Sequence, residues 1–155
     1  MTTPPFRVGV TRDFLKPDGS LGFGDIGLSL LDDQPGIAWE FLPDDYLEMP
    51  AEIADQYDAL MVLGPRIARQ TVAGSKRFAL VARFGVGYDS IDVPACTENG
   101  VLLTITPGGV RRPVATSALA FLLALTHKMF VKDRITREGR WAERLDHNGV
   151  GLVGR

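Results

Sequence analysis

Short apolar segments alternate with helix-like stretches along the first two thirds of the chain. Each apolar segment is a nearly continuous run of Val, Leu, Ile and Phe, which is typical of a parallel strand covered on both faces by helices. The predicted strands are residues 7–10, 37–42, 59–63, 80–84 and 101–105. The predicted helices between them are residues 25–33, 50–57, 70–78 and 93–98. This alternation predicts an α/β fold built on an open parallel sheet with helices on both faces.

Proline and glycine positions agree with these boundaries. Pro50 suits the first turn of a helix, and Asn99 followed by Gly100 suits a helix C-terminus that turns into a strand. Residues 16–24 contain one proline and three glycines, so they predict a turn-rich loop after the first strand.

A long helix is predicted after Pro113. One face carries apolar residues at helical spacing, namely Val114, Ala118, Phe121, Leu122, Leu125 and Met129. Leu119, Leu123 and Phe130 make the opposite face apolar as well, so another domain or a second copy of the chain is expected to cover this helix. Residues 132–145 then predict an amphipathic arm whose apolar contacts are Ile135 and Trp141.

Composition and charge narrow the class of protein. The chain has 155 residues, of which 45% are hydrophobic, so it can form a core of its own. Its formal net charge of −2 gives no basis for binding nucleic acid or an anionic membrane, and the apolar run 118–125 is too short to span a bilayer. Cys96 has no cysteine partner, and the N-terminus lacks a signal-peptide pattern, so a cytoplasmic protein without a metal site is expected.

The fourth predicted strand ends in a tight turn formed by Gly85, Val86 and Gly87. In an open α/β sheet, ligands bind beyond the carboxyl ends of the strands. Two glycines allow the backbone to approach a ligand closely, and consecutive N–H groups can hold a carboxylate or phosphate. The alternative is an ordinary strand-to-helix turn with no ligand.

Three segments together resemble a known family. They are residues 82–92, residues 97–101 and the stretch from Thr106 to Gly109, and they resemble the D-isomer-specific 2-hydroxyacid dehydrogenase family. The phosphoglycerate dehydrogenase branch is the nearest pattern. The resemblance continues through the helix 119–125 and includes residues 151–155. The family often has Asn at the positions of Ile105 and Val110 and an acid at the position of Thr116.

The resemblance implies a flavodoxin-like sheet that binds substrate and a chain that ends before its nucleotide-binding domain. Residues 1–110 would be the substrate-binding domain, 111–145 the connecting helix and dimerisation arm, and 146–155 a linker into a Rossmann domain. The full-length protein would use NAD or NADP, none of it bound by this chain alone, and would form a homodimer. The family's catalytic Arg, Glu and His would lie farther along, so no catalytic residue is expected here.

The resemblance also assigns binding roles. The backbone of Gly85, Val86 and Gly87 would hold the carboxylate of a small 2-hydroxy or 2-keto acid, with Gly64 nearby in the loop after the third strand. Arg66 in that loop would reach the cofactor or an anionic substrate group, or else be a solvated surface arginine.

Two aspartates that follow the glycine turn have structural roles by the same resemblance. Asp89 and Asp92 precede the fourth predicted helix, and an aspartate in this position commonly caps the helix that comes next.

The glycine pattern from Gly149 to Gly154 spells a dinucleotide-binding fingerprint but lacks its context. That motif needs a strand before it and a helix after it, and residues 143–148 do not have the pattern of a strand. Three hypotheses therefore remain for the chain: part of a hydride-transferring enzyme, a non-enzymatic module that binds a small anion, or a dimerisation unit.

Overall fold

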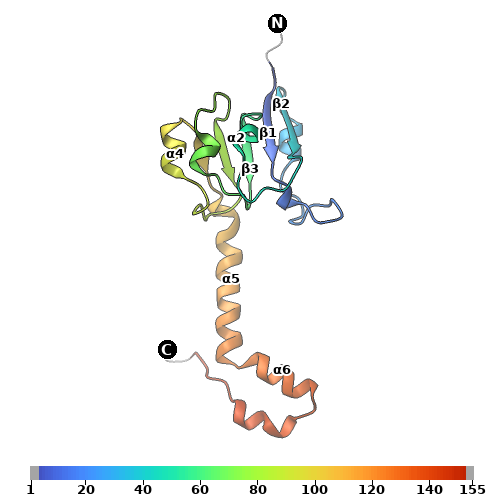
Figure 1. The fold of residues 1–155 in the computed structure, drawn as a ribbon. Helices are drawn as coiled ribbons and strands as arrows, with labels where there is room; N and C mark the ends of the chain where they lie inside the picture. The colour runs from blue at the N-terminus through green and yellow to red at the C-terminus, as the bar shows by residue number, and fades with distance from the viewer. Residues whose placement is uncertain (1–3, 153–155) are drawn as a thin grey trace. The chain divides into compact units, whose positions relative to one another are not determined.

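A computed structural model describes residues 4–152 of the chain and contains the predicted parallel sheet. Its five strands lie in the order β2-β1-β3-β4-β5, and every neighbouring pair is parallel. Their bounds are β1 (Phe6–Val10), β2 (Ile37–Phe41), β3 (Ala59–Val62), β4 (Leu80–Arg83) and β5 (Leu102–Thr104). Figure 1 shows β1, β2 and β3 running side by side. The predicted α/β fold class is confirmed.

The order of the strands places helices on both faces of the sheet. The connecting helices are α1 (Ser29–Asp32), α2 (Ala51–Ala54), α3 (Arg69–Val72) and α4 (Val93–Glu98). The chain moves one way from β1 to β2 and the other way from β2 to β5, and crossovers between parallel strands are right-handed. Helix α1 therefore covers one face, and α2, α3 and α4 cover the other. The contacts of α3 with both α2 and α4 agree with this arrangement.

Three of the connecting helices are shorter than predicted. The helix predicted over 25–33 begins only at Ser29, because Asp25 accepts a hydrogen bond from the Gly27 N–H at 2.8 Å and forms a turn instead. The helix predicted over 70–78 ends at Val72, and Gly74 follows with a φ of +72°. After it, the Asp55 carboxylate binds residues 75–77 and holds them in a loop. Helix α2 likewise occupies only part of 50–57.

The core lies between the sheet and the three helices α2, α3 and α4 that cover one of its faces. Leu60, Val62 and Val81 are fully buried at its centre, on adjacent strands β3 and β4. Cys96 on α4 is 2% exposed and belongs to the same cluster. Burial raises the pKa of the Cys96 thiol, so this group is a weak nucleophile.

Tyr57 lies at the edge of this core, and its ionisation is expected to lower the stability of the fold at alkaline pH. Burial, together with a hydrogen bond from its hydroxyl to Glu40 (3.1 Å) and the charge of Glu40, raises the pKa of Tyr57 from 10.0 to about 12. The fold favours the protonated phenol, so this contribution to stability is complete below pH 10 and is lost as the pH rises towards 12. We expect Glu40→Gln to lower the pKa of Tyr57 in an ultraviolet titration, whereas Glu98→Gln should leave it unchanged. An unchanged pKa in Glu40→Gln would contradict this assignment.

The described chain divides into two compact units between Pro107 and Gly108. The second unit contains α5 (Pro107–Thr126), α6 (Met129–Arg137) and the 3-10 helix η2 (Trp141–His147). Helices α6 and η2 pack against each other, with Ile135 only 1% exposed between them, as predicted for the arm. Trp141, the other predicted contact, is 60% exposed. The N–H of Val150 donates to the carbonyl of Thr126 at 2.8 Å and returns the chain to the end of α5.

The long helix differs from its predicted bounds at both ends. It begins at Pro107 and includes Pro113, which cannot donate to the carbonyl of Gly109. It ends at Thr126 because Lys128 adopts a left-handed conformation with a φ of 53°, and Met129 starts a separate helix. The apolar face predicted to run on to Met129 is therefore divided between two helices.

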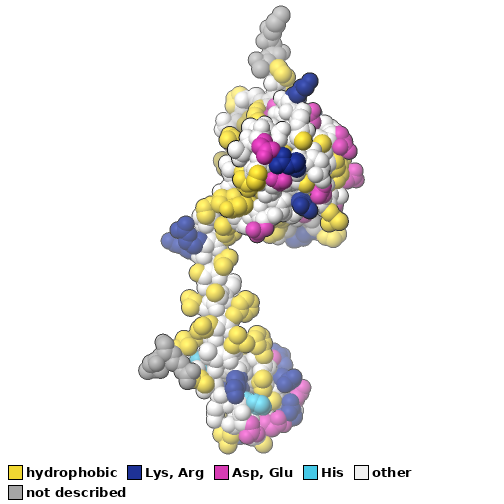
Figure 2. All heavy atoms as spheres, turned by 60° about the vertical axis from the view of Figure 1, so that its left-hand side comes forward, with side chains coloured by type: hydrophobic (Ala, Val, Ile, Leu, Met, Phe, Trp, Pro, Cys, Tyr) yellow, Lys and Arg dark blue, Asp and Glu magenta, His cyan; other side chains and the backbone are white. Residues whose placement is uncertain are grey.

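Helix α5 carries many exposed apolar side chains, as the double-sided pattern indicated. Ala124 is its one buried residue among those described, whereas Leu119, Phe121 and Leu125 are each more than 60% exposed. Figure 2 shows hydrophobic side chains along much of this helix. Within residues 4–152, neither α5 nor any other single helix is long and apolar enough to cross a membrane. Only α5 and α6 taken together, bent by 61°, pass that test of length and composition.

Candidate functional site

The loop after β4 is tied to the end of β5 by two reciprocal hydrogen bonds. Gly85 donates its N–H to Thr106 Oγ1 at 2.7 Å, and the Gly85 carbonyl accepts the Thr106 N–H at 2.8 Å. Gly85 has a φ of +141°, a conformation that side-chain-bearing residues rarely adopt. The glycine is therefore needed at this position for the shape of the backbone.

Arg83 holds the same loop from within. Its Nε donates to the carbonyl of Gly87 at 2.9 Å, and its Nη1 donates to the carbonyl of Phe84. A Cβ on Gly85 would lie 3.2 Å from Nη1, so the guanidinium occupies the space that a side chain at position 85 would need. Both hydrogen bonds of Arg83 go to backbone carbonyls and none to a carboxylate, so its positive charge is not neutralised by them.

Five consecutive backbone donors between β4 and α4, the N–H groups of residues 86–90, have no partner among residues 4–152. The first two belong to Val86 and Gly87, within the part of the loop that Arg83 holds, and both residues are exposed. Neighbouring N–H groups without partners, close to a positive charge, can bind a carboxylate or phosphate. The Gly85 N–H cannot contribute while it donates to Thr106.

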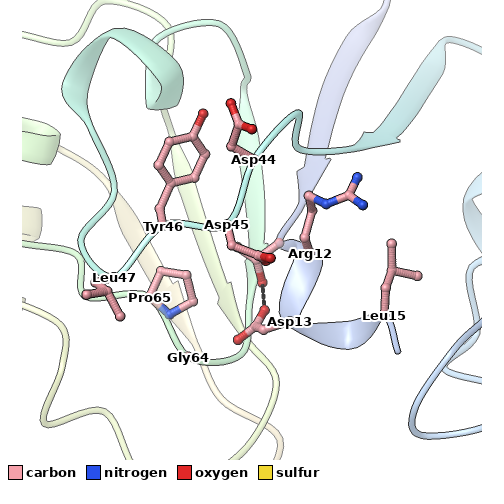
Figure 3. Close-up of a pocket in the computed structure, with 10 residues that line it drawn as sticks. Arg12, Asp13, Leu15, Asp44, Asp45, Tyr46, Leu47, Gly64 and Pro65 are labelled. Atoms are coloured by element: carbon pink, nitrogen blue, oxygen red, sulfur yellow. Dashed lines mark hydrogen bonds between the residues drawn. The ribbon is translucent and has the colours of Figure 1, made fainter. Parts of the chain in front are cut away.

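A pocket of about 420 Å³ lies beside Gly64, at the carboxyl ends of three neighbouring strands. The residues that line it follow β1, β2 and β3, and Figure 3 shows them around the opening. They are Thr11, Arg12, Asp13, Leu15, Asp44, Asp45, Tyr46, Leu47, Gly64 and Pro65. In the sheet register Val62 pairs with Arg83, so Gly64 and Gly85 follow neighbouring strands at one edge of the sheet. The sheet thus brings together the two glycine segments that the sequence singled out.

Asp13 is fixed over Gly64 by a short chain of hydrogen bonds. It belongs to the 3-10 helix η1 (Arg12–Phe14), and its Oδ1 accepts a hydrogen bond from the buried hydroxyl of Thr11 at 2.5 Å. The Thr11 hydroxyl also accepts the N–H of Leu63 at 3.3 Å. A Cβ on Gly64 would lie 2.6 Å from Asp13 Oδ2. Gly64 is therefore required by the position of this carboxylate.

Because of this contact, we expect the effects of substitutions at Gly64 and Asp13 on stability to be coupled. We expect Gly64→Ala to reduce the free energy of unfolding by about 1–3 kcal/mol, because the new methyl group would overlap the held carboxylate. Adding Asp13→Ala should recover most of that loss, as measured by chemical denaturation of the two single variants and the double variant. Gly108→Ala is the control, since a Cβ there meets no atom within 4 Å. Strictly additive losses at positions 13 and 64 would refute the overlap.

Arg66 lies in the same loop as Gly64 but does not line the pocket. Its side chain is 68% exposed and approaches Glu48, with 3.9 Å between Nε and Oε2. An ion pair this exposed contributes little to stability. The backbone of Arg66 is nevertheless fixed, because it exchanges hydrogen bonds with Leu47 and Met49 at 2.9 Å each. The structure thus presents an exposed cationic side chain on an ordered loop.

The two aspartates predicted to be structural behave differently. Asp92 is the N-cap of α4, and its Oδ1 accepts the N–H of Ala95 at 2.9 Å, which confirms the predicted cap. Asp89 is exposed and accepts no hydrogen bond within the described part of the chain, so the capping prediction is wrong for it. A single residue caps the helix, and Asp92 is the one next to its first turn.

Three residues of this site were missed by the sequence reasoning, namely Arg83, Thr106 and Asp13. Arg83 and Thr106 stand inside the segments that carry the family resemblance, and that was the available signal. Residue spacing does not show that the Thr106 hydroxyl reaches a residue 21 positions earlier.

The glycine fingerprint of the tail is not preceded by a strand in the described residues. The 3-10 helix η2 precedes it in place of a strand, and a Cβ on Gly149 would lie 2.6 Å from the Cα of His127. Gly149 thus serves a close backbone contact within its own unit. Residues 153–155 of this segment lie outside the described residues. Residues 4–152 also contain no cluster of three His, Cys, Asp or Glu side chains that could hold a metal ion.

Comparisons with known proteins decide the family. A profile of the D-isomer specific 2-hydroxyacid dehydrogenase family, catalytic domain, matches residues 28–140. The chain belongs to this family. It is 32% identical over 126 residues to a glyoxylate reductase of Pyrococcus horikoshii, covering 77% of this chain and 36% of that relative. It is 33% identical over 101 residues to a D-3-phosphoglycerate dehydrogenase of Archaeoglobus fulgidus, covering 64% of this chain and 19% of the relative.

A solved structure has the same fold as this member of the 2-hydroxyacid dehydrogenase family. D-lactate dehydrogenase from Aquifex aeolicus, complexed with NAD and lactic acid, aligns with a TM-score of 0.73 at 18% identity. The alignment covers 94% of this chain and 41% of that one. The chain therefore spans less than half the length of these relatives.

Proposed function

We propose that this chain is the substrate-binding part of an oxidoreductase that transfers hydride between NAD or NADP and a small 2-hydroxy or 2-keto acid. The observation that carries the proposal is the loop 84–87, where the N–H groups of Val86 and Gly87 are without partners beside Arg83. The substrate carboxylate would accept both N–H groups. Membership of the 2-hydroxyacid dehydrogenase family supports this reaction class.

The residues of the chain would take distinct parts in binding. Gly85 supplies the backbone conformation of the loop, while Val86 and Gly87 supply the donors. Gly64 forms the wall of the neighbouring pocket, which would take the rest of the substrate. Arg66 is proposed as a contact for the cofactor or for an anionic substrate group, supported by its exposed side chain on an ordered backbone.

The cofactor and the proton donor would come from outside this chain. The described residues offer no strand, glycine turn and helix in sequence at the tail, so they do not fit a dinucleotide. We propose residues 1–110 as the substrate-binding domain, 111–145 as connecting helix and dimerisation arm, and 146–155 as the lead into a nucleotide-binding domain. The length of the relatives beyond the matched region supports this division.

We also propose a cytoplasmic setting for the protein, supported by the buried free thiol of Cys96.

The test is reduction of 2-keto acids by the whole protein that contains this chain. Glyoxylate, pyruvate, hydroxypyruvate, phenylpyruvate and 3-phosphohydroxypyruvate would each be offered with NADH and with NADPH, and oxidation of the cofactor followed by absorbance. We expect at least one acid to be reduced. Reduction of none of them with either cofactor would overturn the enzyme assignment and favour a non-enzymatic module that binds a small anion.

We also propose that the protein is a homodimer that uses helix α5. Val114, Phe121 and Leu125 on this helix are 63%, 64% and 70% exposed, and apolar surface of this extent favours association. Replacing Phe121 and Leu125 by Gln should shift the protein from dimer to monomer in sedimentation velocity. Leu47→Gln, at an exposed position of the first unit, is the control and should leave the dimer intact. An unchanged dimer after both substitutions in α5 would place the interface elsewhere.

A further inference from the structure

Three of the four carbonyls of residues 84–87 are held by Arg83 or Thr106, and the fourth, that of Val86, accepts no hydrogen bond within residues 4–152. Arg83 binds the carbonyls of Phe84 and Gly87, and the Thr106 N–H binds that of Gly85. A peptide plane whose carbonyl is fixed has its N–H fixed as well, since the two groups lie in one rigid unit. The Val86 N–H shares its plane with the Gly85 carbonyl, so the backbone N–H of Thr106 sets its direction. The Gly87 N–H shares its plane with the Val86 carbonyl, and the peptide planes before and after that one are held by Thr106 and by Arg83.

Arg83 and Thr106 hold different backbone groups of this short loop. The Thr106 hydroxyl accepts the Gly85 N–H, which removes that donor from competition for an anion. The Arg83 guanidinium spans the loop from residue 84 to residue 87 and brings a positive charge next to the free donors. An arrangement fixed before binding lowers the entropic cost of holding a ligand.

We propose that Arg83 and Thr106 are positioning residues that hold loop 84–87 in the form that binds the substrate carboxylate. They set the affinity for the acid, and they do not touch the reacting carbon. This inference rests on the proposed function for its kinetic readout, but it also makes a prediction about anion binding that needs no turnover.

The kinetic test compares conservative and disruptive variants of the whole protein. Arg83→Met removes both the clamp and the charge, and we expect KM for the 2-keto acid to rise at least about tenfold. In the same variant kcat should change less than about threefold, and KM for the nicotinamide cofactor should not change. Arg83→Lys keeps the charge but cannot span two carbonyls, so its KM should lie between those of Arg83→Met and the unmodified protein.

Thr106 offers a matched pair and Arg69 a control. Thr106→Ser keeps the hydroxyl and should retain the original KM, whereas Thr106→Val should raise it. Arg69→Met removes a surface arginine that pairs with Glu98 and should leave KM unchanged. If Arg83→Met fails to fold, Arg83→Lys and the Thr106 pair still test the inference.

A binding measurement separates this inference from the proposed function. Titrating the whole protein with pyruvate should shift the backbone amide resonances of Val86 and Gly87, and the shifts should require higher pyruvate concentrations in Arg83→Met. Such shifts in a protein that reduces no 2-keto acid would refute the enzyme assignment and leave the positioning role intact. An active protein whose KM and amide shifts are the same in Arg83→Met, or in which kcat falls while KM holds, would overturn the positioning role.

Discussion

Replacing Gly85 by alanine should raise the KM of the whole protein for its 2-keto acid by about 10- to 100-fold. Gly85 has a φ of +141°, and its missing Cβ leaves room for the Arg83 guanidinium. A methyl group there would force the loop to a different conformation or displace Arg83, and in either case the Val86 and Gly87 donors would move. Steady-state kinetics with a fixed saturating cofactor would measure the effect.

Gly74→Ala is the matched control for this substitution. Gly74 also has a positive φ, +72°, but a Cβ there would meet no atom within 4 Å, and the residue follows α3 away from the glycine loop. We expect it to lose about 1 kcal/mol of stability with no change in KM. Equal KM values for Gly85→Ala and the unmodified protein would mean that the loop does not bind the acid.

Leu60→Ala should lower the free energy of unfolding by about 2–5 kcal/mol. Leu60 is fully buried on β3, in the middle of the sheet, and its Cδ2 fills the space above Gly9, where a Cβ would lie 2.7 Å away. Removing it would leave a cavity between the sheet and the helices. Chemical denaturation followed by circular dichroism would give the change in midpoint and slope.

Leu47→Ala provides the matched comparison, because the same side chain is removed where it is 97% exposed. We expect a change within about 0.5 kcal/mol. Similar losses of unfolding free energy at positions 47 and 60 would show that burial of the leucine side chain does not determine how much its removal destabilises the fold.

The strands could be predicted from sequence more closely than the helices. Continuous apolar runs such as 59–63 mark buried strands because both faces of a central strand need apolar side chains. The connecting helices are single turns or little more, and single side chains decide where they end. Asp55, for instance, lies at the end of the neighbouring helix α2 and accepts hydrogen bonds from residues 75–77, and no local pattern in 70–78 reveals that contact.

The candidate site could be predicted in part. The glycines at 64 and 85 to 87 stand out because turns at strand ends need them, and the parallel register brings them to one edge of the sheet. The conditions that make Gly85 and Gly64 necessary come from side chains on other segments, the guanidinium of Arg83 and the carboxylate of Asp13. Such contacts depend on rotamers and on the packing of several strands, so spacing along the chain does not disclose them.

The most direct test is a crystal structure of the whole protein with a bound 2-keto acid. We expect a carboxylate oxygen at about 2.7–3.2 Å from the backbone nitrogens of Val86 and Gly87. We also expect Gly85 still to donate to Thr106 and Arg83 still to hold the carbonyls of Phe84 and Gly87. An acid bound at another place, with the Val86 and Gly87 N–H groups facing solvent, would refute this binding mode.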